Sequence, residues 1–243
     1  MEQDDSHCDE HDGYHPVADP GAPDFLFHPQ HRFDPTFSSK LATTNQVVLS
    51  MKIPPNLSGD LRGLRLLIRE LQREEIDKVW TIDRGELVEK IYYHEIGQLV
   101  LKSERYDISG WQPGMRESFG PSLLNCFDRA GTFLGAFDDD ELMGVAVLES
   151  RLIGSAKDQL QLMFLHVSRS VRGKGLGRIL FEKAAMRARK LGAERLYVSA
   201  TPSENTVDFY QHLGCKVTDE VDAGLFELEP EDIHLEYTIP IKL

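Results

Sequence analysis

The stretch from His166 to Arg178, HVSRSVRGKGLGR, decides the fold class of this sequence. It starts at the end of an apolar run, residues 160–167, which predicts a buried strand. It leads into residues 176–191, where apolar side chains recur every three or four positions, as in an amphipathic helix. A glycine-rich turn between a strand and a helix exposes the unpaired N–H groups of the helix N-terminus. We therefore interpret the turn as a binding site for an anionic group, and in particular for a phosphate.

Basic residues are concentrated in this segment. Residues 169–190 contain eight Lys and Arg and a single acid, Glu182. The whole chain of 243 residues has 27 Lys and Arg against 40 Asp and Glu, and its formal net charge is −13. The negative average disfavours nucleic acid as a partner, because nucleic-acid binding depends on neutralising many phosphates. The local positive charge instead favours one polyanionic ligand at the turn.

Two common phosphate-binding loops do not fit the turn. A P-loop requires Ser or Thr directly after its lysine, whereas Gly175 follows Lys174 here. A dinucleotide fingerprint requires Gly-x-Gly-x-x-Gly and an acidic residue after the next strand. Residues 173–177 have the spacing Gly-x-Gly-x-Gly, and the next predicted strand ends in the uncharged residues 199–201. A nucleotide hydrolase is unsupported, and a dinucleotide-binding oxidoreductase is a distant alternative.

Around the turn, apolar patterns and turn residues predict alternating strands and helices. The expected strands are residues 64–69, 99–101, 132–137, 142–148, 160–167, 196–200, 215–217 and 233–241. The expected helices are two within residues 72–95, broken near residues 83–85, and one each at residues 115–128, 176–191 and 203–214. Such an order predicts a mixed α/β sheet rather than a helix bundle or a β-sandwich.

Residues 1–60 differ in composition from the rest of the chain. The first 40 residues hold nine acids, two bases, five of the twelve prolines and five of the nine histidines. This composition predicts an acidic, Pro- and His-rich extension that is mostly disordered, followed by one domain at residues 61–243. The extension contains a short His/Cys cluster, which we interpret as solvated tail rather than a metal site: His7, Cys8, His11 and His15.

Cysteine usage and hydropathy indicate the cellular compartment in which we expect the protein. The cysteines Cys8, Cys126 and Cys215 are odd in number and far apart, so they do not predict a disulfide framework. The acidic N-terminus does not look like a signal peptide, and no apolar run approaches the ~20 residues of a membrane helix. We expect a cytoplasmic protein without membrane contact.

Two motifs in order carry a resemblance to a known family. Arg172, Gly175 and Gly177 fit the pattern Arg/Gln-x-x-Gly-x-Gly/Ala, and residues 209–214 read Phe-Tyr-x-x-x-Gly. Over about residues 61–243 the sequence resembles the GNAT superfamily of acetyl-CoA-dependent N-acetyltransferases. The resemblance implies a mixed, mostly antiparallel central sheet whose central strands splay apart and are flanked by helices. It also implies acetyl-CoA as cosubstrate, and it allows a homodimer through the final strands.

The resemblance implies a cofactor site around the turn. Backbone groups of residues 165–167 would pair with the pantetheine arm, and N–H groups of residues 172–178 would hold the pyrophosphate. The side chains of Arg172 and Lys174 could also meet phosphate oxygens, and Asn205 could replace an asparagine that many members carry two positions earlier. The implied cofactor-binding residues are Leu165, His166, Val167, Arg172, Gly173, Lys174, Gly175, Leu176, Gly177, Arg178 and Asn205.

The catalytic acid and base are implied to different degrees. Tyr210 corresponds to the tyrosine that protonates the departing CoA thiolate, although a tyrosine on a helix is otherwise usually a core residue. A glutamate that some members carry on the central strand is replaced here by Gln161. The candidates for the base are Glu149 and His166, or water. His166 follows apolar alternating neighbours and is equally well explained as a core histidine.

The acceptor site is expected in the first helices and in residues 98–114. Asp83, Arg84 and Glu86 lie at the predicted helix break, where they could contact an acceptor or cap a helix. Tyr93, with Tyr92 and Trp111, could line a pocket or belong to the core. The acidic body of the chain suits a cationic amine, either a small molecule or a protein lysine or N-terminus.

These inferences imply acetyl transfer from acetyl-CoA to a primary amine by direct attack, with Tyr210 as acid. The alternative is a non-catalytic acyl-CoA-binding sensor or scaffold on the same fold, because the strand glutamate and the usual asparagine are missing.

Overall fold

The computed structural model describes residues 66–241. The predicted extension at residues 1–60, including the His/Cys cluster, lies outside the described residues. The first half of the described chain contains β1 (Leu66–Glu70), the 3-10 helix η2 (Arg73–Thr81), β2 (Glu86–Glu95), β3 (Gln98–Ile108), α1 (Met115–Asp128), β4 (Thr132–Asp138) and β5 (Glu141–Ile153). The second half contains β6 (Gln159–Val167), the 3-10 helix η3 (Arg169–Val171), α2 (Leu176–Lys190), β7 (Arg195–Ala200), α3 (Glu204–His212), β8 (Lys216–Val217), α4 (Ala223–Leu228) and β9 (Ile233–Thr238). Within residues 66–241, none of the helices combines the length and the apolar character needed to cross a bilayer.

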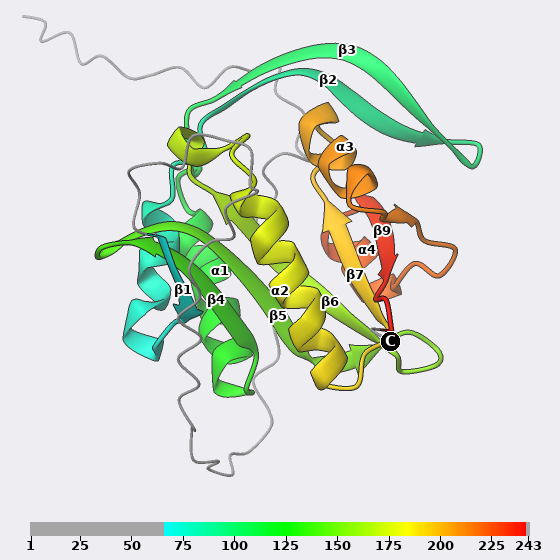
Figure 1. Cartoon of the computed structure of the whole chain (residues 1–243). Coiled ribbons are helices and arrows are strands. Elements are labelled where there is room, and N and C mark those ends of the chain that lie inside the picture. Colours follow the sequence, from blue (N-terminus) through cyan, green and yellow to red (C-terminus); the bar gives the residue numbers. More distant parts are fainter. Residues whose placement is uncertain (1–65, 242–243) are drawn as a thin grey trace, which may run out of the picture.

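Seven strands form the central sheet in the order β1-β4-β5-β6-β7-β9-β8. Neighbouring strands are antiparallel except β6 and β7, which run parallel. The strands β2 and β3 form a separate hairpin, which arches over α3 in Figure 1. The predicted fold class, a mixed and mostly antiparallel sheet flanked by helices, is confirmed.

Helices cover both faces of the sheet and create two apolar cores (Figure 1). On one face, α2 packs its apolar stripe against the sheet, which buries Leu176, Leu180, Ala184 and Ala188 with Leu160 and Leu196. On the other face, η2 and α1 bury Ile76, Val79, Leu123 and Cys126 with Phe133, Val145 and Val147. Burying a large aliphatic side chain contributes about 1.5–3 kcal/mol, so each face fixes its helices firmly on the sheet.

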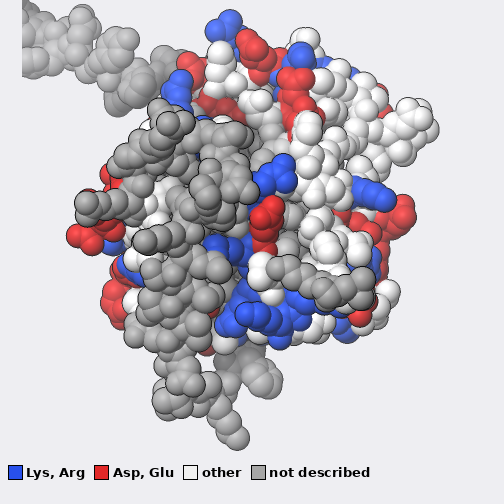
Figure 2. Space-filling model, in the orientation of Figure 1, with Lys and Arg blue, Asp and Glu red and all other residues white. Residues whose placement is uncertain are grey.

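The basic side chains of α2 lie on its outer surface. Its last turn contains Arg187, Arg189 and Lys190. Figure 2 shows Lys and Arg gathered across the lower part of the face that carries α2. The later bases of the segment at residues 169–190 therefore form a solvated helix face, whereas the earlier ones surround the glycine turn.

A bulge between β5 and β6 changes the direction of the side chains on β6. Val147 pairs with Phe164, but the next pair is Leu148 with Leu162, so one residue of β6 is extra. Leu162 belongs to the core under α2, whereas Phe164 belongs to the core under α1. The simple alternation expected from Leu160 to His166 is therefore broken, and the end of β6 presents Phe164 and His166 to the α1 face.

The central strands splay apart, as predicted. The pairing of β6 with β7 is confined to residues 159–161 of β6 and residues 195–197 of β7. Toward their carboxyl ends the two parallel strands separate, and from Leu162 onward the backbone of β6 pairs with no strand on the β7 side within residues 66–241. The separation opens a gap in the middle of the sheet that connects its two faces.

The prediction of a second helix within residues 72–95 is wrong, because residues 86–95 form β2. Val88 and Ile91 are both buried and lie three positions apart, which is a helical spacing. The register shift between Val88 and Lys90 places an extra residue in β3, because Val88 pairs with Tyr106 and Lys90 pairs with Ser103. The spacing of the two buried residues therefore imitated a helical pattern within a strand, and the expected short strand at residues 99–101 is part of the longer β3.

Candidate functional site

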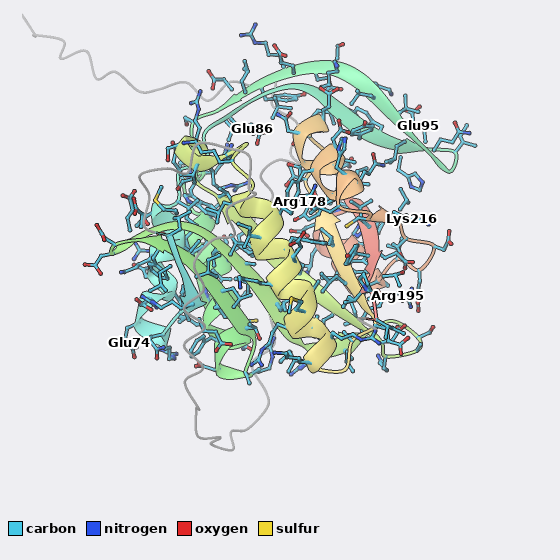
Figure 3. All side chains as sticks on the ribbon, viewed as in Figure 1. Glu74, Glu86, Glu95, Arg178, Arg195 and Lys216 are labelled. Carbon is cyan, nitrogen blue, oxygen red and sulfur yellow. The ribbon has the colours of Figure 1, made fainter. Side chains whose placement is uncertain are left out.

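A cleft of about 1350 Å³ lies where β6 and β7 separate. On the α2 face it is lined by the glycine turn, the start of α2 and one side of α3. On the α1 face it is lined by the loop before β2, the start of α1 and residues 228–232, which connect α4 to β9. In Figure 3, Arg178 lies between α2 and α3, and Glu86 lies at the base of the β2–β3 hairpin. The cleft therefore has two chemically different sides that meet between the splayed strands.

The glycine turn presents a row of backbone N–H groups. Gly175 begins α2 in the left-handed conformation, with φ of 88°, a value that favours glycine. Ile179 is the first residue of the helix to donate to a carbonyl, that of Gly175 at 3.2 Å. Within the described chain, the N–H groups of residues 173–178 have no backbone acceptor. These donors and the positive end of the helix dipole form a suitable site for a phosphate group.

Gly177 permits a close approach between α2 and α3. A Cβ atom added at Gly177 would lie 3.2 Å from Cζ of Phe209, which is tighter than an ordinary contact. Both residues line the cleft. The absence of a side chain at position 177 therefore keeps the cleft between α2 and α3 at its present width.

Arg172 does not point its side chain toward a phosphate site. Its guanidinium donates to three backbone oxygens, those of Val167 at 2.9 Å, Gly85 at 3.0 Å and Asp83 at 3.2 Å. Glu86 lies 3.9 Å away and adds an ion pair. The side chain thus connects the loop before β2 to the end of β6. In this structure it has a structural role in place of the predicted phosphate contact.

Replacing Arg172 with leucine should lower the free energy of unfolding by about 2–4 kcal/mol, because it leaves three carbonyl groups without their donor. Urea unfolding followed by circular dichroism measures the change. Arg172→Lys should restore little, since an ammonium group cannot reproduce the planar fork of donors. Lys174→Leu, two residues away, is the matched control, and an equal loss in that variant would contradict the structural role of Arg172.

Tyr210 faces the cleft from α3. Ser203 caps this helix by accepting a hydrogen bond from the Thr206 N–H, which fixes the orientation of its first turn. Tyr210 is only 6% exposed, and within residues 66–241 its hydroxyl makes no hydrogen bond. Burial, with smaller contributions from Cys215 and Asp232, raises the pKa of the phenol. Tyr210 is therefore a protonated donor in a water-poor part of the cleft.

Two carboxylates that the sequence did not suggest lie on the α1 side, Glu229 and Asp232. Ser199, at the end of β7, donates to Oδ2 of Asp232 at 3.3 Å. Burial, followed by the charge of Glu229, raises the pKa of Asp232 well above its ordinary value. Burial likewise raises the pKa of Glu229. The pair therefore holds a proton more readily than ordinary carboxyl groups do.

Aromatic side chains surround His166 on the same side of the cleft. The ring centroids of Trp111 and Phe164 lie 5.0 Å and 5.1 Å from that of His166, both edge to face. Burial, together with the positive charges of Arg84 and Arg172, lowers the pKa of His166 well below its ordinary value. His166 is therefore a neutral imidazole at pH 7, able to form hydrogen bonds but a weak base.

Glu86 and Asn205 join the two sides of the cleft. Nδ2 of Asn205 donates to Oε1 of Glu86 at 3.0 Å, which links α3 to the base of the β2–β3 hairpin. Most other predicted site residues also line the cleft: Arg84, Leu165, His166, Val167, Arg172, Gly173, Gly175, Gly177, Arg178 and Tyr210.

Other predicted site residues do not line the cleft. Asp83 accepts a hydrogen bond from the Gly85 N–H at 2.8 Å, and Tyr93 donates to Glu104 at 2.5 Å on the hairpin. Glu149 pairs with Arg129 at 2.5 Å, beside the bulged part of β5, and is not among the residues that line the cleft. Leu176 is buried in the core and offers only its backbone, and Lys174 is not among the residues that line the cleft.

Sequence and structure comparisons identify similar proteins. The protein family described as "Acetyltransferase (GNAT) family" matches residues 93–215. A nourseothricin acetyltransferase is similar in structure with a TM-score of 0.54 and 16% identity, covering 72% of this chain and 99% of its own. A putative streptothricin acetyltransferase from Bacillus anthracis str. Ames, in complex with acetyl coenzyme A, has a TM-score of 0.52 and 16% identity, covering 73% and 99%. No curated protein matches the sequence.

Proposed function

Because the chain belongs to the GNAT acetyltransferase family, we propose that it transfers the acetyl group of acetyl-CoA directly to a primary amine. The observation that carries the proposal is the two-sided cleft between β6 and β7. Its α2 side offers phosphate-binding N–H groups, and its α1 side offers carboxylates and aromatic walls. A donor and an acceptor that enter from opposite faces would meet between the strands.

Acetyl-CoA binds on the α2 side in this proposal. The N–H groups of residues 173–178 hold the pyrophosphate, and the exposed Arg178 adds long-range attraction. The pantetheine arm pairs with the unpaired edge of β6 at residues 165–167, as an added strand would. The glycine at position 177 leaves room for the arm between α2 and Phe209. The acetyl group then lies near the point where the strands part.

Tyr210 supplies the proton that the departing thiolate needs. Its raised pKa keeps the phenol protonated over the working pH range, and its hydroxyl has no competing partner in the described chain. Proton donation from a positioned side chain contributes typically about 10²–10⁴-fold to a rate.

Asp232, with Glu229, is the proposed base. The acceptor arrives as an ammonium ion and attacks only after it loses a proton. A carboxylate with a raised pKa is a better match for this transfer than an ordinary one. Ser199 holds Asp232 beside the end of β7, which is close to the expected acetyl position. His166 contributes a neutral hydrogen-bonding group in this scheme rather than the base.

Direct attack is preferred to an acyl-enzyme intermediate. The described cysteines, Cys126 and Cys215, are free thiols that are 0% and 4% exposed and do not line the cleft. Burial raises the pKa of Cys215 to about 12 and that of Cys126 further, so neither provides a thiolate nucleophile.

The proposal is tested by measuring CoA release from acetyl-CoA with a panel of primary amines. The wild type should release CoA in an amine-dependent way. Gly177→Leu should raise the KM for acetyl-CoA at least ~10-fold, because the side chain fills the space beside Phe209. Gly120→Leu is the matched control, since a Cβ at Gly120 meets nothing within 4 Å. Tight acetyl-CoA binding without CoA release for any amine would instead identify a non-catalytic acyl-CoA sensor.

A further inference from the structure

Arg84 stands out among the residues of the α1 side. Its guanidinium carbon lies 4.5 Å from the centroid of the Trp111 ring, and Nη1 donates only to Sδ of Met115 at 3.7 Å. Within residues 66–241 no carboxylate lies within 4.0 Å of it, although it lines the cleft. By contrast, the cleft residue Arg172 satisfies its donors on three carbonyl groups. Arg84 therefore keeps most of its five donors free for a ligand.

The free donors of Arg84 are held in a poorly hydrated place. Burial, and then the positive charge of Arg172, lower the pKa of Arg84 to about 10, so the group remains a cation at neutral pH. Trp111 is itself fixed, because its Nε1 donates to the Ile82 carbonyl at 2.9 Å. A preorganised guanidinium that is partly removed from water and has no carboxylate in direct contact is costly, unless a ligand supplies the anion.

The same side of the cleft also contains the opposite charge. Glu229 and Asp232 lie on the loop before β9, and the carboxylate of Asp232 acts electrostatically on Arg84. Phe164 and Phe119 provide an apolar wall, with ring centroids 6.2 Å apart. The α1 side thus combines a guanidinium with free donors, a pair of acids and aromatic surface.

We infer that the acceptor is a free amino acid, whose carboxylate binds to Arg84 while its amine faces Asp232 and Glu229. A planar guanidinium matches a carboxylate in a bidentate geometry, so Arg84 would fix the orientation of the acceptor as well as bind it. A polyamine or an aminoglycoside has no group for Arg84 and would place another cation beside it. The inference rests on the proposed N-acetyltransferase function and selects one of the acceptor classes that the sequence leaves open.

The test compares amino acids with their decarboxylated counterparts, for example phenylalanine with phenethylamine and lysine with cadaverine. CoA release gives kcat/KM for each compound, and the ratio within each pair measures the contribution of the carboxylate. For at least one pair, the wild type should prefer the amino acid by ~10–100-fold, the range expected for a well-oriented charged hydrogen bond. Arg84→Met should bring that ratio close to 1, and Arg84→Lys should give an intermediate ratio, because lysine keeps the charge but loses the fork.

Matched measurements separate a local effect from misfolding. Arg105→Met removes an exposed arginine of β3 and should leave the ratio unchanged. The Kd for acetyl-CoA and the Tm are measured for every variant. An equal or greater rate with the decarboxylated amines would overturn the amino-acid acceptor while leaving the N-acetyltransferase proposal intact. A ratio that neither Arg84 variant changes would overturn the role of Arg84. Absence of CoA release with every amine would overturn the proposed function itself, and the acceptor with it.

Discussion

Tyr210→Phe should lower kcat by about 10²–10⁴-fold and leave the Kd for acetyl-CoA within a factor of about two. The substitution removes one hydroxyl from a side chain that is 6% exposed and keeps its contact with Phe209, where the ring centroids are 5.2 Å apart. The loss should therefore fall on the proton delivered to the thiolate rather than on binding or folding. Steady-state CoA release gives kcat, and calorimetric titration gives the Kd.

Tyr237→Phe is the matched control for this experiment. Tyr237 also packs against the α2 core, with its ring centroid 5.0 Å from that of Phe181, but it does not line the cleft. Its variant should keep the wild-type kcat. A Tyr210→Phe enzyme with wild-type turnover would show that another group, or solvent, protonates the leaving thiolate.

Asp232→Asn should lower kcat/KM by about 10²–10³-fold and change the pH dependence of the reaction. Because burial and the charge of Glu229 raise the pKa of Asp232, its carboxyl is protonated at low pH and becomes a base only above that raised pKa. Wild-type activity should therefore rise with pH as the pair loses its proton. In Asp232→Asn this rise should be lost, since an amide accepts no proton.

The control for Asp232 is Glu227→Gln, an exposed acid of α4 that does not line the cleft, which should keep the pH profile. The free energy of unfolding provides an independent test of the raised pKa of Asp232. A carboxyl whose folded pKa lies above its unfolded pKa destabilises the folded state as pH rises between the two values. Asp232→Asn should therefore unfold at pH 8 with a free energy no lower than that of the wild type. An acid limb that is unchanged in Asp232→Asn would assign the base to another group.

The sequence was sufficient for the glycine turn and the elements around it. The turn, α2, the β4–β5 hairpin and α3 each follow from local patterns that the packing reinforces: a glycine turn, an apolar helical stripe, an Asp-rich turn and a Ser cap. The splay of β6 and β7 was expected only from the family resemblance, because no local pattern states where two parallel strands stop pairing.

The errors arise where tertiary structure overrides local spacing. Val88 and Ile91 have a helical spacing although both lie in β2, and the extra residue of β6 between Leu162 and Phe164 turned His166 to the α1 face. Glu229 and Asp232 were not selected by any pattern in the sequence. Their place in the cleft depends on β9 pairing antiparallel with β7, which brings the residues before Ile233 beside the end of β7. A topology prediction that included this pairing would have found them.

Arg172 shows a second reason why the sequence alone did not predict the site. Its position in the glycine motif suggested a phosphate contact, yet its guanidinium binds carbonyl groups more than eighty residues earlier in the chain, at Asp83 and Gly85. Arg84 in turn was selected only as part of a helix break. That its donors are free can be recognised only when the positions of the neighbouring charges in three dimensions are known.

A crystal structure of the protein with bound CoA tests the central claim most directly. The account predicts the pyrophosphate at the N–H groups of residues 173–178, the pantetheine arm along residues 165–167 of β6, and the sulfur between the splayed strands near Tyr210. The α1 side, with Arg84 and Asp232, should remain open to the acceptor. A pyrophosphate bound elsewhere, or a sulfur atom outside the gap between β6 and β7, would contradict it.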